Sequence, residues 1–245
     1  MPVMEKEDNM HYNITPGLLK EIAGSHTNDK IVNELVKYLP EVIQKYQINT
    51  DLRLANFLAQ IAHESDHFRT LQEYASGNAY EGRRDLGNVK KGDGHRFKGR
   101  GVIQITGRAN YERYGRELGL DLVNNPDMAL EPRVSLLIAA KYWEDNNLNE
   151  LADKGNTKQI TRKINGGYNG LKSRLELVAR ARQAINESKV SLLKAVEKPV
   201  VTPVPATPEP TPVPVFNEPI QPQPVVPPQV DEASEFVQDQ LHDED

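Results

Sequence analysis

The 245-residue chain contains no cysteine, so disulfide bonds and thiolate metal sites are both excluded. No apolar run approaches the roughly 18 residues that a membrane-spanning helix needs, so we expect no membrane insertion. Residues 1–13 are polar and acidic and lack the apolar segment of a secretory signal peptide. We therefore expect synthesis in the cytoplasm, with any route to an outside substrate provided by another protein.

Basic residues are also missing from one part of the chain. Residues 199–245 contain no Lys or Arg, but they hold nine acidic residues and 12 of the 17 prolines. The proline density of 199–230 favours extended polyproline II and prevents packing. The remaining residues carry 30 basic and 26 acidic side chains, a net charge of +4, which suits an anionic polymer but is too small to indicate nucleic acid. We expect a flexible N-terminus (1–13), a folded domain (14–198), a disordered Pro-rich linker (199–230) and an acidic tail (231–245) available to a partner.

Apolar residues recur at helical spacing through most of 14–198. Between Ala75 and Ile105 this period is lost and glycines recur, which indicates long loops. We expect a mainly α (α+β) domain with a small β-hairpin, whose clearest strand is 101–106. Pro40 should kink or split the first clear helix. The expected helices are 31–46, 51–68, 108–118, 132–146, 157–164 and 171–185.

The most regular of these helices, 51–68, carries a glutamate at the edge of its apolar face. At about 100° per residue, Glu64 falls beside Phe57. A carboxyl group held against apolar side chains loses solvation, which raises its pKa and keeps it protonated near neutrality, as a general acid requires. A second carboxylate, Glu73, follows nine residues later. Two carboxylates in different environments are the minimum equipment for cutting a glycosidic bond.

The same helix contains the pattern HExxH from His63 to His67, which is the signature of zinc proteases. Two imidazoles one helical turn apart would bind zinc, and the glutamate would activate water. A third ligand is required, for which His95 in a loop is a loose candidate. On the helical wheel His63 and His67 lie opposite the apolar face, so we favour solvated surface histidines and keep zinc proteolysis as an alternative.

Several short motifs occur in a defined order, and their order is more specific than any one of them. Together they resemble glycoside hydrolase family 19, the chitinase family, and especially its phage and prophage endolysin branch. The resemblance covers roughly residues 14–186. It implies a lysozyme-like, two-lobed helical fold with a cleft, and hydrolysis of β-1,4 bonds to N-acetylated sugars with inversion. The motifs are AHES at 62–65, a carboxylate nine residues further on, GRGVIQITGRANY at 99–111, NNP at 124–126 and INGG at 164–167.

The resemblance also implies roles for individual residues. Glu64 looks like the general acid, and Glu73 looks like the general base, with Glu81 as the alternative base. Thr106 occupies the place of the family's Ser or Thr that holds the water. Two carboxylates and water suffice for this chemistry, so no metal or organic cofactor is implied. The residues that resemble substrate contacts are Gln104, Asn110 and Asn165.

The leading hypothesis is an endolysin-type hydrolase that cleaves the glycan of peptidoglycan. Such an enzyme would accumulate in the host cytoplasm and be released to the cell wall or periplasm without its own signal peptide. Chitin is the alternative substrate, since both polymers present N-acetylglucosamine. The absence of cysteine and the short spacing between the two carboxylates differ from plant chitinases and favour peptidoglycan. A non-catalytic glycan-binding protein, tethered by its acidic tail, is a further alternative.

Overall fold

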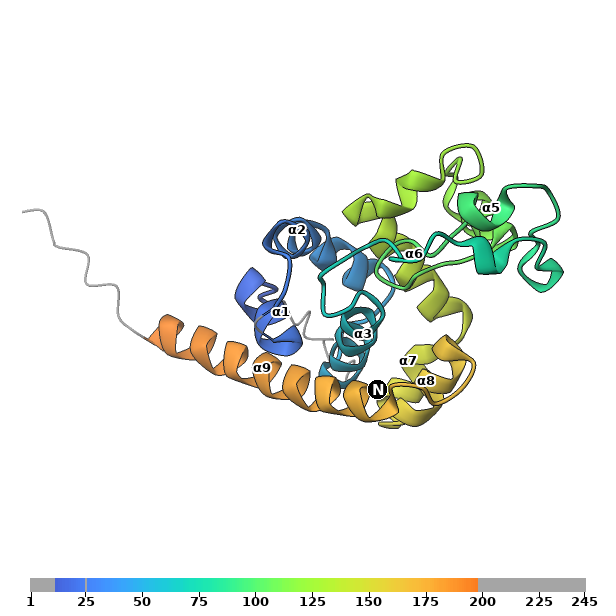
Figure 1. Ribbon diagram of the computed structural model, residues 1–245. Helices are drawn as coiled ribbons and strands as arrows, with labels where there is room; N and C mark the ends of the chain where they lie inside the picture. Colours follow the sequence, from blue (N-terminus) through green and yellow to red (C-terminus); the bar gives the residue numbers. More distant parts are fainter. Residues whose placement is uncertain (1–11, 25, 198–245) are drawn as a thin grey trace, which may run out of the picture. The chain divides into compact units, whose positions relative to one another are not determined.

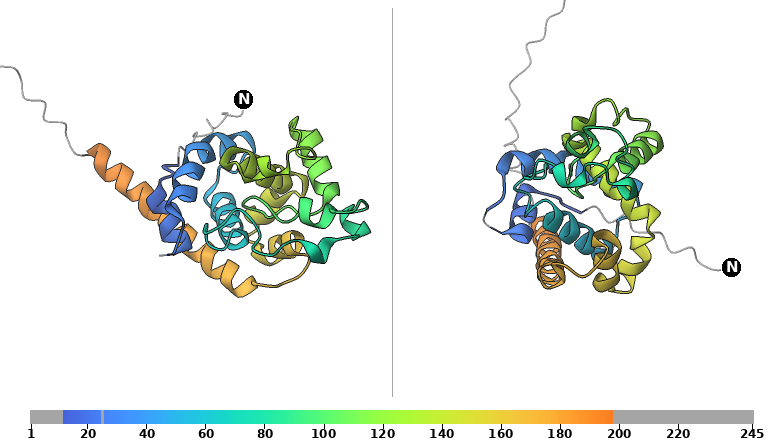
Figure 2. Two further views of the ribbon diagram at one scale, coloured as in Figure 1. Left: turned by 45° about the horizontal axis from the view of Figure 1, so that its top comes forward. Right: turned by 45° about the vertical axis from the view of Figure 1, so that its right-hand side comes forward.

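The centre of the fold is a helix that is buried around its whole circumference. This helix, α3 (Asp51–Glu64), begins at Thr50, whose side-chain oxygen accepts a hydrogen bond from the Arg53 amide and caps the helix. Every residue from Leu54 to Ala62 is buried. The computed structural model describes residues 12–24 and 26–197, and in it α3 packs chiefly against the long helix α9 (Leu171–Glu197), as Figures 1 and 2 show.

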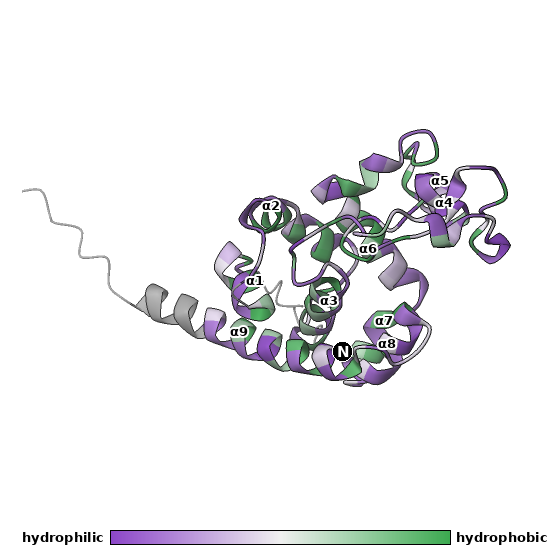
Figure 3. Cartoon of the chain, viewed as in Figure 1, coloured by the Kyte–Doolittle hydropathy of each residue, from purple (hydrophilic) through white to green (hydrophobic). Residues whose placement is uncertain are grey.

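Further helices surround α3 and complete the core. Contacts with α3 are made by α1 (Pro16–Ala23) and by α7 (Leu148–Asp153). Two others, α2 (Asp29–Lys45) and α6 (Pro132–Asp145), pack on each other, and α8 (Thr157–Asn165) contacts both α7 and α9. In Figure 3 hydrophobic and hydrophilic bands alternate along α9, as expected for a helix with one face on the core.

The stretch between α3 and α6 is mostly irregular. It contains two 3-10 turns, η1 (Asn78–Tyr80) and η2 (Arg84–Leu86), and the short helix α4 (Asp93–Arg96). The helix α5 (Arg108–Leu118) and a third 3-10 turn, η3 (Pro126–Leu130), follow. A buried ion pair holds this stretch together, because Arg108 donates to both carboxylate oxygens of Asp93, at 2.9 and 2.6 Å.

The predicted mainly helical, lysozyme-like class is confirmed. The predicted helix 108–118 has the observed bounds, since glycines flank it on both sides, and 132–146 and 157–164 each differ by one residue at the C-terminal end. The short helices α1, α4 and α7 were not predicted. Pro40 lies inside α2, which continues past it and is not split in two.

The predicted strand 101–106 is wrong. Within the described residues the hairpin is reduced to two isolated antiparallel bridges, Gln72 with Arg100 and Arg100 with Ile105. The chain turns between them, with φ of 83° at Gly101 and 54° at Gln104. The alternating polar and apolar residues there form a tight turn that closes at the bridge between Arg100 and Ile105.

Most of the predicted flexible N-terminus (1–13), the linker (199–230) and the tail (231–245) lie outside the described residues. The domain boundaries therefore stay predictions. Among the residues that are described, no helix has the length and apolar character to cross a membrane.

Candidate active site

Two of the predicted carboxylates line one cleft. Glu64 is the last residue of α3, and Glu73 lies beyond the turn that follows it. Both border a cavity of about 380 Å³. Gln104, a predicted substrate contact, lies on the same cavity wall. The other residues that line this cleft are His63, Asp66, His67, Thr70, Gln72 and Tyr74.

A left-handed turn ends α3 and brings the two carboxylates to the same cleft. Asp66, His67 and Phe68 have φ of 51°, 60° and 58°, in the left-handed region that costs a residue with a side chain about 1–2 kcal/mol. The hydroxyl of Ser65 offsets part of this cost, since it donates to the Ile61 carbonyl at 2.6 Å and accepts from the Phe68 amide at 3.1 Å. The ring of Phe68 is fully buried, which anchors the turn.

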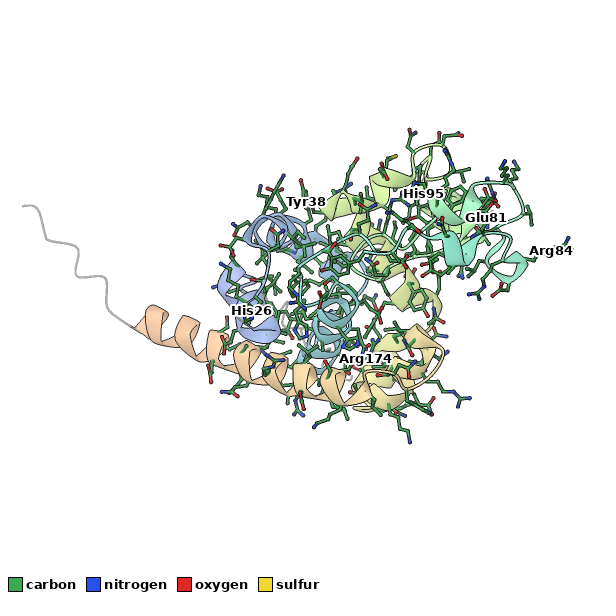
Figure 4. All side chains as sticks on the ribbon, in the orientation of Figure 1. His26, Tyr38, Glu81, Arg84, His95 and Arg174 are labelled. Carbon is green, nitrogen blue, oxygen red and sulfur yellow. The ribbon has the colours of Figure 1, made fainter. Side chains whose placement is uncertain are left out.

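Glu64 does not have the purely apolar surroundings that the helical wheel predicts. Its side chain is 18% exposed and forms an ion pair with the guanidinium of Arg174, which is 1% exposed. Arg174 also donates to the side-chain oxygen of Gln60, so one guanidinium holds two residues of α3. The prediction failed because a wheel counts only the residues of its own helix, whereas this cation comes from α9 (Figure 4).

Glu73 is held by two hydrogen-bond donors, one on each carboxylate oxygen. The Tyr80 hydroxyl donates to Oε1 at 2.8 Å, and the Gly99 amide donates to Oε2 at 2.9 Å. A Cβ atom at Gly99 would lie 2.9 Å from the Gln104 side-chain oxygen and 3.1 Å from Glu73 Oε2. A side chain at this position would therefore displace the Gln104 amide or the Glu73 carboxylate, which accounts for one glycine of the GRG motif. The donors leave lone pairs on both oxygens, so Glu73 can still accept a hydrogen bond from water.

The remaining predicted residues from the QIT and RANY motifs, Thr106 and Asn110, support the turn rather than line the cleft. Gln104 donates to the Gly101 carbonyl at 2.7 Å, and the Thr106 hydroxyl donates to the Gln104 carbonyl at 3.1 Å. Asn110 in turn donates to the Thr106 carbonyl at 2.8 Å. Asn165, at the end of α8, is exposed and is not among the residues that line the cleft. A substrate contact by Thr106, Asn110 or Asn165 stays a prediction.

Glu81, the alternative base, is engaged elsewhere. Its two carboxylate oxygens accept hydrogen bonds from the amides of Gly92 and Gly94, at 2.7 and 2.8 Å. Figure 4 shows Glu81 well apart from Arg174, the ion-pair partner of Glu64. Glu81 thus ties the loop before α4 to the turn after η1. This geometry favours Glu73 as the base, although neither assignment is tested by it.

The histidines of the HExxH pattern are partly buried, so the prediction of solvated surface residues is wrong. The Nδ1 atom of His63 lies 3.1 Å from the Ser173 hydroxyl of α9. Burial lowers the pKa of His63 to about 4, and the charge of Arg174 contributes in the same direction. His67 donates from Nδ1 to the Ala23 carbonyl of α1 at 2.7 Å. Each imidazole therefore joins α3 or its following turn to a different helix.

The zinc alternative fails on geometry. The helix ends at Glu64, so His67 is not one helical turn from His63 on a common face, as the zinc motif requires. The suggested third ligand, His95, contacts the Ser76 carbonyl at 2.9 Å and does not line the cleft. Across residues 12–24 and 26–197, no group of three or more His, Cys, Asp or Glu side chains is arranged to hold a metal ion.

Known proteins resemble the part of the chain that forms this cleft. The glycoside hydrolase 19 family model, described as chitinase class I, matches residues 44–161, which include both cleft carboxylates. A family 19 domain-containing protein of Haemophilus influenzae is 29% identical over 191 residues, covering 65% of this chain and 94% of that protein. An Arabidopsis thaliana endochitinase is 38% identical over 115 residues, which are 46% of this chain and 39% of the plant protein.

Solved structures show the same fold. A bacterial family 19 chitinase superimposes with a TM-score of 0.59 at 20% identity, covering 70% of this chain and 94% of that one. Chitinase C from Streptomyces griseus gives a TM-score of 0.60 at 18% identity, covering 73% and 95%. The family model, the bacterial relative and the cleft with its two carboxylates agree. The chain therefore carries a glycoside hydrolase family 19 domain over residues 44–161, and its relatives and structural neighbours support a glycoside hydrolase.

Proposed function

We propose that this glycosidase cleaves β-1,4 bonds of the peptidoglycan glycan by an inverting mechanism. Glu64 donates a proton to the leaving oxygen, and Glu73 takes a proton from the attacking water. The observation that carries this proposal is the shared cleft, in which the two carboxylates have different partners. An inverting reaction requires such a pair on either side of the scissile bond, with space for one water between them.

The contacts of each carboxylate fix its position and leave it able to bind a proton or a water. Arg174 binds Oε1 of Glu64, while Oε2 accepts no hydrogen bond from the described residues and is the oxygen that would carry the transferred proton. Glu73 is fixed by Tyr80 and the Gly99 amide, which orient an ionised carboxylate toward a water. In this arrangement water and two side chains complete the reaction: the proton lost by water goes to Glu73, and the proton of Glu64 goes to the leaving group.

A second groove favours a substituted glycan over chitin. It has a volume of about 480 Å³ and shares Thr70 and Gln72 with the catalytic cleft. Chitin is an unbranched chain of identical sugars, whereas peptidoglycan carries a short peptide on alternate sugars. An adjoining groove offers space for such a branch. Its other lining residues are Asn28, Lys30, Ile31, Glu34, Arg69, Leu71, Leu130 and Pro132.

The charges around this groove also suit a peptide that ends in carboxylates. Lys30 is exposed and forms no ion pair with the described residues, so its ammonium group is available. The other charged groups are already paired, Glu34 with Lys37 and Arg69 with Asp66. The groove therefore has a net positive charge among its lining residues, several of which are apolar.

Chitin is the second candidate substrate. The observation that favours it is the naming of relatives, since the Arabidopsis protein is called an endochitinase and the Streptomyces griseus neighbour is called a chitinase. However, the match to this chain covers only 39% of the Arabidopsis protein, whereas it covers 94% of the Haemophilus protein. The cleft itself suits either polymer, because both contain N-acetylglucosamine.

Digestion of purified peptidoglycan and of chitin would test the proposal. Wild type and the variants Glu64→Gln, Glu73→Gln and Glu81→Gln would be compared with and without EDTA, with products identified by mass spectrometry and their anomeric configuration followed by NMR. We expect new reducing ends from peptidoglycan, insensitivity to EDTA, and loss of at least about a hundredfold in rate for Glu64→Gln and Glu73→Gln. Glu81→Gln should keep its activity. Full activity in Glu73→Gln, or cleavage of chitin alone, would contradict the assignment of the base or of the substrate respectively.

We further propose an endolysin role, in which the enzyme collects in the host cytoplasm and reaches the wall after another protein opens the membrane. Expression inside bacteria should then leave cells intact until a pore-forming agent is added. Lysis without that agent would contradict this route. Expression of the Glu64→Gln variant in place of the wild type provides the matched control, since it should not lyse cells under either condition.

A further inference from the structure

An exposed aromatic ring stands at the edge of the cleft. Tyr74 is 77% exposed and follows Glu73 directly in the chain. The other large hydrophobic side chains that are exposed within the described residues, Val89, Tyr168 and Leu175, do not line the cleft. Tyr74 alone among them borders the cavity that contains both carboxylates. Neither proton transfer nor the packing of the core uses this ring.

The ring is held in position even though it is exposed. Its hydroxyl donates to Oδ2 of Asp66 at 3.0 Å, and this bond raises the pKa of the phenol. The other oxygen of Asp66 is paired with Arg69. Asp66 itself belongs to the left-handed turn that ends α3. Asp66 thus holds the ring of an exposed tyrosine in place, whereas an ordinary surface tyrosine is free to rotate.

A fixed and exposed ring beside the reacting bond suits one ligand in particular. One face of a β-linked pyranose presents mainly C–H groups, and an aromatic face carries the negative side of a quadrupole that attracts such groups. A ring that is already oriented loses little conformational freedom on binding. We propose that Tyr74 is a sugar-binding platform that stacks against a pyranose next to the scissile bond, with Asp66 and Arg69 as positioning residues. The inference rests on the proposed use of this cleft, but not on whether the glycan is peptidoglycan or chitin.

The binding test uses the full chain with Glu64→Gln, so that a soluble oligomer of N-acetylglucosamine stays intact during calorimetry. Adding Tyr74→Ala should weaken binding by about three- to tenfold, the range typical of one aromatic contact. Tyr74→Phe keeps the ring and should weaken it by no more than about twofold. Val89→Ala, an exposed apolar residue outside the cleft, is the matched control and should bind as the parent does.

Steady-state kinetics separate a platform from a structural role. In the otherwise wild-type enzyme, Tyr74→Ala should raise KM by a similar factor with kcat nearly unchanged, and the melting temperature should not move because the ring is exposed. Asp66→Ala frees the ring without removing it, and should raise KM by about twofold. Unchanged binding in Tyr74→Ala would refute the platform, as would equal losses in Tyr74→Phe and Tyr74→Ala, because the hydroxyl and not the ring would then be the important group. An active Glu64→Gln enzyme would instead refute the proposed function of the cleft.

Discussion

The ion pair between Glu64 and Arg174 provides the sharpest test of the site's energetics. Arg174 is 1% exposed, and its guanidinium bridges Glu64 and Gln60 of the central helix. Replacing it by Met keeps much of the side-chain volume but removes the charge and both hydrogen bonds. Glu64 would then lack its cationic partner in a site that is only 18% exposed. Gln60, which is fully buried, would lose the partner of its side-chain oxygen.

The size of the effect follows from these two losses. Removing one partner of a buried ion pair costs about 3–5 kcal/mol, and the partial exposure of Glu64 places this case near the lower end. We expect Arg174→Met to lower the free energy of unfolding by about 3 kcal/mol, which for a folded domain of this size lowers the melting temperature by roughly 6–12 °C. Arg174→Lys keeps a charge but not the planar fork, so about half of this loss is expected.

A double-mutant cycle isolates the pair from other effects of the substitution. Urea unfolding would be measured for wild type, Arg174→Met, Glu64→Gln and the double variant, with equal slopes as the check that the unfolding reaction is the same. Because Glu64→Gln removes the unpaired charge, the double variant should be more stable than the sum of the single effects by about 1–3 kcal/mol. An interaction energy below about 0.5 kcal/mol would show that the pair does not stabilise the fold.

Three further predictions concern pH, backbone and substrate. His63 stays neutral in the folded protein because its pKa is lowered from 6.5 to about 4, so its contribution to stability should be fully present above pH 6.5 and be lost as the pH drops toward 4. After discounting for partial exposure, we expect the free energy of unfolding to fall by about 1–2 kcal/mol over this range. A His63→Gln variant whose urea midpoint shows the same pH dependence would contradict this origin. Gly77→Ala should lower the free energy of unfolding in urea by about 2–4 kcal/mol, because φ is 84° and a Cβ atom would collide with the Gly94 carbonyl. Gly82→Ala, where φ is also positive but the space is open, should lower it by less. Lys30→Glu should slow the digestion of peptidoglycan severalfold and leave chitin digestion unchanged, and equal effects on both would contradict the peptide-binding groove.

Much of the helical framework could be predicted because its signals are local. The helix α5 was predicted with the correct bounds, since Gly107 precedes it and Gly119 ends it. The shared cleft of Glu64 and Glu73 was also anticipated, because a carboxylate at a helix end and another shortly beyond it are near in the chain. Short helices such as α1 gave too few periods for an apolar pattern, although the capping Thr15 followed by Pro16 was a readable start signal.

The environment of the site could not be predicted from the same local signals. The left-handed turn at 66–68 contains no glycine, so nothing in the sequence marks the positive φ values. The turn is stabilised instead by Ser65 and by the burial of Phe68, which are tertiary features. Arg174 is likewise more than a hundred residues away from its partner Glu64 along the chain. Tyr74 was overlooked because an exposed tyrosine in a loop has no distinguishing pattern before its hydrogen bond to Asp66 is known.

The segment HESDH shows why a short motif gives two incompatible readings. A zinc site would require its histidines to converge on one point, but in the structure the two imidazoles bind separate partners. A helix end where several elements meet needs many polar groups, and such groups are also those that bind metals. Glu64, the proposed acid, therefore sits where the surrounding helices are tied together, and replacing a buried partner of this segment should disturb it through the packing of α3, α9 and α1. The partners are Ser173 for His63, Arg174 for Glu64, Phe68 for Ser65, Arg69 and Tyr74 for Asp66, and Ala23 for His67.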